Sequence, residues 1–67
     1  MFREYRKKLN LTQEALVDKA DLNTRTIQRI ENEEEIPSLE TLSKLVNVLD
    51  IKDKDLVEYI KRFSKQK

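Results

Sequence analysis

The chain contains no histidine, no cysteine and no glycine, and only one proline, among its 67 residues. Without cysteine it can form neither a disulfide nor a thiolate metal site. Without histidine it lacks the commonest general base and the commonest transition-metal ligand. Without glycine it cannot form a glycine-rich phosphate-binding loop. These absences argue against an enzyme, and we expect no catalytic residue, no metal and no cofactor.

Long hydrophobic runs are also absent, because the longest uninterrupted apolar stretch has only three residues. A membrane-spanning helix needs about 20 apolar residues, so we expect neither a signal peptide nor contact with a membrane. The expected location is cytoplasmic. A chain of 67 residues forms one domain at most, and so small a core is marginally stable without a partner.

The chain also lacks an excess of either positive or negative charge. Charged residues make up 40% of the chain, but 14 Lys and Arg are offset by 13 Asp and Glu, which leaves a net charge of +1. This balance is unlike that of a protein that binds nucleic acid through bulk positive charge. Any binding to nucleic acid therefore requires basic side chains that are placed together on one surface.

Apolar residues recur at helical spacing along the whole chain, and no stretch alternates as a strand does. The sequence therefore predicts an all-α fold, a compact domain of five short helices over residues 1–67. A basic tail, from about residue 64, is expected to be disordered. The apolar faces of the five helices are predicted to be Phe2, Tyr5 and Leu9; Leu16, Val17 and Ala20; Ile27 and Ile30; Leu39, Leu42, Leu45, Val46 and Leu49; and Leu56, Val57, Tyr59, Ile60 and Phe63.

Residues that favour helix starts separate these apolar faces. Thr12, Asn23 and Asp53 are expected to be N-caps, because their short polar side chains can accept a hydrogen bond from a free backbone N–H. Pro37-Ser38 is expected to open the fourth helix, since proline is well suited to the start of a helix. The turns between the helices are short, as in a compact helical domain.

The predicted third helix, which follows Asn23, has two different sides when it is drawn at about 100° per residue. Ile27 and Ile30 fall on one side, and the other side holds Thr24, Arg25, Gln28 and Arg29. Two guanidinium groups, an amide and a hydroxyl are groups that read base edges in a major groove, where Arg pairs with guanine and Gln with adenine. A solvated helix face explains the same pattern, and for this helix alone it is the simpler explanation.

The surrounding sequence favours DNA binding. Residues 11–32, LTQEALVDKADLNTRTIQRIEN, resemble the helix-turn-helix of the phage-repressor-like (Xre/Cro) family. Residues 36–51, IPSLETLSKLVNVLDI, resemble the helix that follows the motif in that family. The resemblance covers nearly the whole chain, to at least Leu56, and joined motifs in the right order are more specific than one helix. It implies a lambda-repressor-like fold with the helix-turn-helix at the second and third helices.

The resemblance also implies roles for individual residues. DNA bases would be contacted by Thr24, Arg25, Gln28 and Arg29, and DNA phosphates by Thr12, Gln13 and Thr26. Arg6 and Glu31 match a pair that forms a structural salt bridge in family members, although Arg6 can equally be an ordinary surface cation. The fifth helix has more apolar residues than one small core needs, which predicts a homodimer with an interface of Leu56, Tyr59, Ile60 and Phe63.

The chain departs from the family at its turns. Glycine is common between the two helices of the motif and after the fourth helix, where this chain has Asp21 and Asp50. Aspartate tolerates the left-handed conformation better than most residues, so both turns should form at some cost. The loop after the third helix commonly carries Lys or Arg, and here it carries Glu33, Glu34 and Glu35. These acids either face solvent, weaken sequence-independent attraction to DNA, or contact a partner protein.

The sequence thus predicts a sequence-specific regulator of transcription that binds double-stranded DNA, as a homodimer on an inverted-repeat operator. Two alternatives stay open. One is a protein-interaction module, such as an antitoxin or an anti-repressor partner, which uses the same fold. The other is the DNA-binding piece of a longer sensor-regulator. The acidic run favours the first alternative, the basic face of the third helix opposes it, and the length of the chain does not exclude the second.

Overall fold

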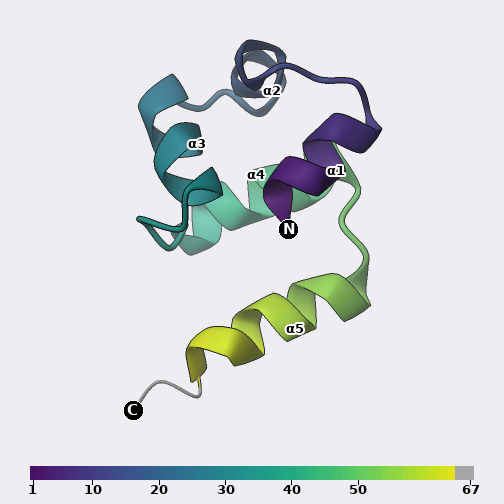
Figure 1. Cartoon of the computed structure of the whole chain (residues 1–67), viewed down its shortest axis with the longest axis vertical. Helices are drawn as coiled ribbons and strands as arrows, with labels where there is room; N and C mark the ends of the chain where they lie inside the picture. Colours follow the sequence, from purple (N-terminus) through teal and green to yellow (C-terminus); the bar gives the residue numbers. More distant parts are fainter. Residues whose placement is uncertain (65–67) are drawn as a thin grey trace.

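The computed structural model describes residues 1–64, and residues 63 and 64 for the backbone only. Five helices follow one another: α1 (Phe2–Lys8), α2 (Gln13–Ala20), α3 (Thr24–Glu31), α4 (Leu39–Leu49) and α5 (Asp53–Ser64) (Figure 1). The described part contains no strand, so the predicted all-α fold of five helices is confirmed. Residue 64, the predicted start of a disordered tail, is the last residue of α5, and the rest of the tail lies outside the described residues.

Side-chain caps explain where three of the helices begin. Thr12, Asn23 and Ser38 each accept a hydrogen bond from a backbone N–H in the first turn, at 3.0, 2.8 and 3.2 Å. Each cap satisfies a donor that no carbonyl of its own helix can reach. The prediction for Asp53 was wrong, because Asp53 is the first residue of α5 rather than its cap. The carbonyl of Lys52 instead accepts the first bond of that helix, at 3.0 Å.

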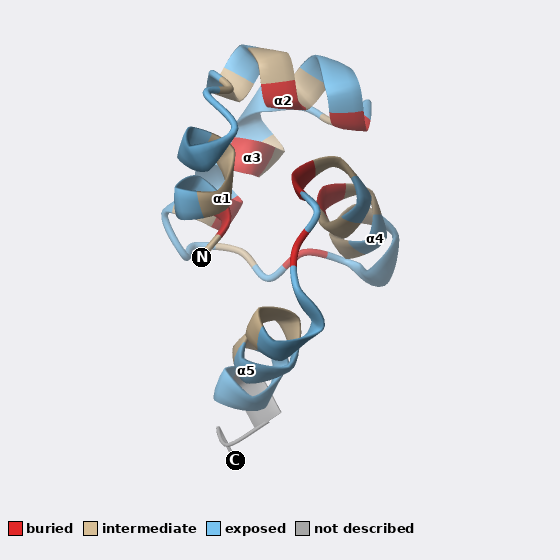
Figure 2. Ribbon diagram, turned by 90° about the vertical axis from the view of Figure 1, so that its right-hand side faces the viewer, coloured by how far each residue is buried: buried red, intermediate tan, exposed pale blue. Residues whose placement is uncertain are grey.

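The hydrophobic core lies among the first four helices. Its buried apolar side chains are Phe2, Leu16, Ala20, Ile27, Ile30, Leu45, Leu49 and Ile51. Figure 2 shows the buried residues in α1–α4 and in the segments that connect helices, while the part of α5 whose burial is described has none. Because each large side chain removed from water contributes about 1.5–3 kcal/mol, the four-helix part carries most of the stability.

Helix α4 contributes less to the core than the sequence predicted. Of the five residues predicted for its apolar face, Leu45 and Leu49 are buried and Leu42 and Val46 are partly buried, but Leu39 is 80% exposed. Leu39 is the first residue of α4, and the described part of the chain leaves most of its side chain uncovered. A large apolar side chain is therefore left in solvent beside the start of α4.

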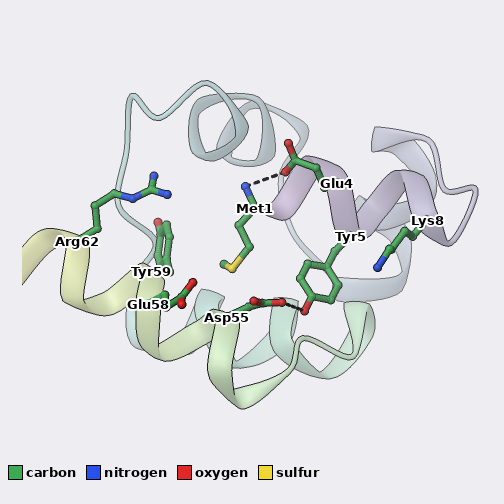
Figure 3. Close-up of a pocket in the computed structure, with 8 residues that line it drawn as sticks. All are labelled: Met1, Glu4, Tyr5, Lys8, Asp55, Glu58, Tyr59 and Arg62. Atoms are coloured by element: carbon green, nitrogen blue, oxygen red, sulfur yellow. Dashed lines mark hydrogen bonds and ion pairs between the residues drawn. The ribbon is translucent and has the colours of Figure 1, made fainter.

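Helix α5 contacts α1, the loop after α3 and the core, and Figure 3 shows side chains of α1 and α5 facing each other. The Tyr5 hydroxyl donates to the carboxylate of Asp55 and accepts from the backbone N–H of Lys52 (3.2 Å). The rings of Phe2 and Tyr59 meet edge to face, with their centroids 5.0 Å apart. A few polar and aromatic contacts, rather than fully buried side chains, thus hold α5 in place.

Among the residues that the structure describes, four have a left-handed backbone, with φ between 54° and 61°: Asn10, Asp21, Glu33 and Asp50. This conformation costs roughly 1–2 kcal/mol for a residue that has a Cβ atom, and Asn and Asp tolerate it best. Asp21 and Asp50 form the left-handed ends of α2 and α4, as the sequence predicted. Glu tolerates the left-handed conformation less well than Asn or Asp, so the turn at Glu33 is the most strained of the four.

Candidate nucleic-acid interface

Helices α2 and α3 are joined by a tight turn over residues 21–23. Asp21 ends α2 in the left-handed conformation, and the Leu22 N–H donates to the carbonyl of Val17 (3.0 Å). Asn23 then caps α3 at once. Ile27 and Ile30 are 1% and 3% exposed, so they fix which side of α3 faces the core. The turn and these two side chains together fix the orientation of α3.

The opposite side of α3 carries the residues that the sequence predicted to contact DNA bases. The structure brings four exposed side chains together there: Thr24, Arg25, Gln28 and Arg29. The first turn of α3 contains no acidic residue. Thr26, predicted to contact a phosphate, is partly buried between the exposed and the core sides. The exposed face of α3 therefore presents mainly hydrogen-bond donors and two positive charges.

The start of α2 is the second predicted contact region, for phosphates. The Thr12 hydroxyl caps the helix, and the Gln13 side-chain amide donates to the carboxylate of Glu31 (3.0 Å). The Gln13 side chain is thus held against the protein. The backbone N–H groups of Gln13 and Glu14 have no acceptor within the helix, and such groups suit a phosphate.

A buried carboxylate ties the helix-turn-helix to α1. Glu31, at the end of α3, has a side chain only 1% exposed and pairs with Arg6, whose side chain is 11% exposed. Two bonds from the Arg6 guanidinium reach the Glu31 oxygens, at 2.7 and 3.1 Å, and a third reaches the carbonyl of Leu11 at 2.9 Å. The structure therefore contains the Arg6–Glu31 ion pair that the resemblance implied.

The charge of Glu31 is stabilised by this arrangement. Burial alone would raise the pKa of the Glu31 carboxyl, but the hydrogen bonds from Arg6 and Gln13 and the charge of Arg6 outweigh burial. The pKa of Glu31 is consequently lowered from its ordinary value. The same pair raises the pKa of Arg6, because the guanidinium donates to a carboxylate. Both side chains stay ionised at neutral pH.

The sequence analysis missed Arg3 as a member of this network. The Nε atom of Arg3 lies 3.5 Å from a Glu31 oxygen, and its guanidinium donates to the Asn32 side chain (3.1 Å). A usable signal was present, since Arg3 and Arg6 are three residues apart and share one side of α1. The Gln13 bond to Glu31 was missed because no local spacing connects residues 18 positions apart.

The acids after α3 are partly neutralised within the chain. Glu35 lies 3.9 Å from Arg29 on α3, and Glu33 lies 3.7 Å from Arg62 on α5. Glu34 is exposed and forms no ion pair among the described residues. The three acids of this run therefore have three different surroundings.

The residues predicted for a dimer interface differ in exposure where the structure describes them. Leu56 and Tyr59 are partly buried against the core, whereas Ile60 is 48% exposed. The side chain of Phe63 lies outside the described residues. A groove of about 300 Å³ runs between α4 and α5 and is lined mainly by apolar side chains: Leu39, Leu42, Val46, Leu56 and Ile60.

The described residues offer neither a membrane-spanning helix nor a metal site. No helix there is both long enough and apolar enough to cross a membrane. No group of acidic side chains in the same part of the chain is placed to hold a metal ion.

Comparison with known proteins agrees with this geometry. A helix-turn-helix family model, HTH_3, matches residues 2–56, which span α1 to the first residues of α5. A search of curated proteins and a search of solved structures gave no match at the significance required. The family is one of DNA-binding proteins rather than enzymes. Since the match covers far more than half of the sequence, the chain belongs to the HTH_3 (Xre/Cro-type) family of helix-turn-helix proteins.

Proposed function

We propose that this chain recognises a specific operator sequence, as a homodimer on an inverted repeat, and regulates transcription from it in the cytoplasm. Membership of the HTH_3 family implies DNA binding and a role in transcription. The exposed face of α3 is the observation that supports sequence-specific reading most strongly. Its four outward side chains have the chemistry of base contacts, and two buried isoleucines hold the opposite side.

The proposal assigns different tasks to two regions. Side chains of α3 read bases, with Arg25 and Arg29 suited to guanine and Gln28 suited to adenine. The start of α2, with Thr12 and the N–H groups that follow it, contacts a phosphate and fixes the orientation of α3 in the groove. Thr26, at the border of the exposed face, is placed for a second phosphate contact.

A selection from random duplexes with the purified chain identifies the preferred sequence. Arg25→Ala and Gln28→Ala should each weaken binding to that sequence by about 1–3 kcal/mol and should change binding to random duplex little. Lys54→Ala is the matched control, because it removes an equally exposed positive charge from α5, away from α3. Equal losses on selected and random duplexes would reduce the α3 side chains to phosphate contacts.

For assembly we propose that a second copy of the chain covers the α4–α5 groove. Leu39 and Ile60, at 80% and 48% exposed, lie along the groove. In an isolated domain these apolar side chains contribute no free energy of burial, whereas a partner that covers them would bury them. A two-fold pair would let each copy place an exposed side chain in the other's groove. It would also place two α3 helices in successive major grooves, about 34 Å apart.

Sedimentation tests this assembly. Ile60→Glu should dissociate the dimer and weaken binding to a two-site operator far more than binding to one half-site. Leu9→Glu is the matched control, because Leu9 is 47% exposed but does not line the groove. A wild-type chain that is monomeric at tens of micromolar, in the presence of a two-site duplex as well as alone, would refute the proposed dimer.

A further inference from the structure

The acids after α3 are placed by the backbone of α3 itself. The Glu33 N–H donates to the carbonyl of Ile30 (3.1 Å), and the Glu34 N–H donates to the carbonyl of Arg29 (2.8 Å). With Glu33 left-handed, these two bonds form the Schellman ending of a helix, in which the chain folds back over the last turn. The position of the next residue, Glu35, relative to the last turn of α3 is therefore set by backbone hydrogen bonds.

This turn brings one acid back onto the DNA-reading face. An oxygen of Glu35 lies 3.9 Å from the guanidinium of Arg29, and both side chains are partly in solvent, at 39% and 48% exposed. Glu34 forms no ion pair among the described residues, and the oxygen of Glu33 nearest a cation is turned toward α5, 3.7 Å from Arg62. Only Glu35 shares its charge with a side chain of the exposed α3 face.

We propose that Glu35 is a specificity-determining residue, which makes Arg29 a poor phosphate contact while leaving it able to read a base. This inference rests on the proposed function. A phosphate that approaches Arg29 meets the Glu35 carboxylate as well, so two anions must share one guanidinium. The O6 and N7 atoms of guanine are neutral acceptors and meet no such repulsion. Arg29 has five N–H donors, so it can keep Glu35 and still bind guanine.

The expected size of the effect follows from Coulomb's law. Two unit charges about 6 Å apart in water repel enough to lower binding about threefold, and a less polar surrounding raises this toward tenfold. The penalty falls on any duplex that offers only phosphates to Arg29. A duplex with guanine in the right position avoids most of it. Glu35 therefore widens the difference between selected and random DNA by weakening the random complex.

Glu35→Gln and Glu34→Gln form a matched pair for the test, because they remove the same charge from neighbouring positions of one loop. Neither affects the backbone bonds that end α3. For Glu35→Gln we expect affinity for random duplex to rise about three- to tenfold, and the slope of log affinity against log salt to steepen by about 0.9, the value for one further phosphate contact. Glu34→Gln should change affinity less than twofold and leave the slope as it is.

A second background isolates the pair. In a chain that carries Arg29→Gln, the further change Glu35→Gln should no longer raise affinity for random duplex. The guanidinium of Arg29, which Glu35 pairs with in the wild type, is then absent. Equal effects of Glu35→Gln and Glu34→Gln would overturn the inference and leave only a general charge effect. So would an effect of Glu35→Gln that persists without Arg29. Neither result affects the proposed function, which fails separately if random-duplex selection enriches no sequence.

Discussion

Arg6→Ala should destabilise this domain more than any other single change to a surface-reaching side chain. The substitution leaves the Glu31 carboxylate, 1% exposed, without its two bonds from the guanidinium. Removing one partner of a buried ion pair costs about 3–5 kcal/mol. The Gln13 amide and the nearby Arg3 remain, so we expect a loss of about 2–4 kcal/mol. A 67-residue domain has about 3–10 kcal/mol in total, so this loss unfolds a large fraction of the protein under mild conditions.

Equilibrium urea unfolding, followed by circular dichroism at neutral pH, measures this loss. Arg3→Ala is the matched control, because Arg3 lies on the same helix and faces the same carboxylate, but is 46% exposed and 3.5 Å away. Its loss should stay below about 1 kcal/mol. If Arg6→Ala and Arg3→Ala differ by less than the error of the measurement, burial of Glu31 does not make Arg6 important, and the reasoning fails.

The wild type and Arg6→Ala should respond differently to acid. The pKa of Glu31 is lowered in the folded wild type, so its contribution is complete above the unfolded value, about 4.3. It is lost as pH falls through the lower, folded pKa. In Arg6→Ala the carboxyl of Glu31 is buried without its main cation. Protonation removes the buried charge, and it therefore reduces the destabilisation that this charge causes. The difference in stability between the two proteins should shrink from pH 7 to pH 3, and a constant difference would contradict this account.

Three further predictions concern packing and backbone. Glu33→Gly should stabilise the domain by about 0.5–1 kcal/mol in urea unfolding, because glycine removes the Cβ atom from a left-handed position, and Asp21→Gly should gain less; an equal gain would mean that Glu33 is no more strained than Asp21. Leu45→Ala should cost about 2–5 kcal/mol, since Leu45 is fully buried, while Leu39→Ala should cost under about 0.5 kcal/mol. Tyr5→Phe removes both hydrogen bonds of the hydroxyl, so amide hydrogen exchange should quicken in α5 and stay unchanged in α4; equal protection in wild type and variant would show that the hydroxyl does not hold α5.

Local features of the structure could be predicted because their causes are local. Thr12 and Asn23 cap helices through bonds to N–H groups two or three residues away, and this spacing is visible in the sequence. Ile27 and Ile30 fix the buried side of α3 by their period alone. The Arg6–Glu31 pair spans 25 positions and could be anticipated only from the family resemblance.

Features that depend on how helices meet could not be predicted. Leu39 has the spacing of a core residue, but in the described part of the chain its side chain is 80% exposed. The contact between Tyr5 and Asp55 joins residues 50 positions apart, and no local spacing connects them. The pairing of Glu35 with Arg29 depends on a left-handed residue, Glu33, whose side chain gives no hint of that conformation.

The buried carboxylate at the end of α3 limits how freely the helix-turn-helix can be moved to another protein. A recognition helix grafted from this chain would carry Glu31 with it, and the new scaffold would have to supply a cation where α1 places Arg6. Without one, the graft would bury an unpaired charge at its own base. Replacing Glu31 in the donor segment, or transplanting α1 together with α2 and α3, avoids that burden. The smallest portable unit is therefore three helices, although only the third is expected to read bases.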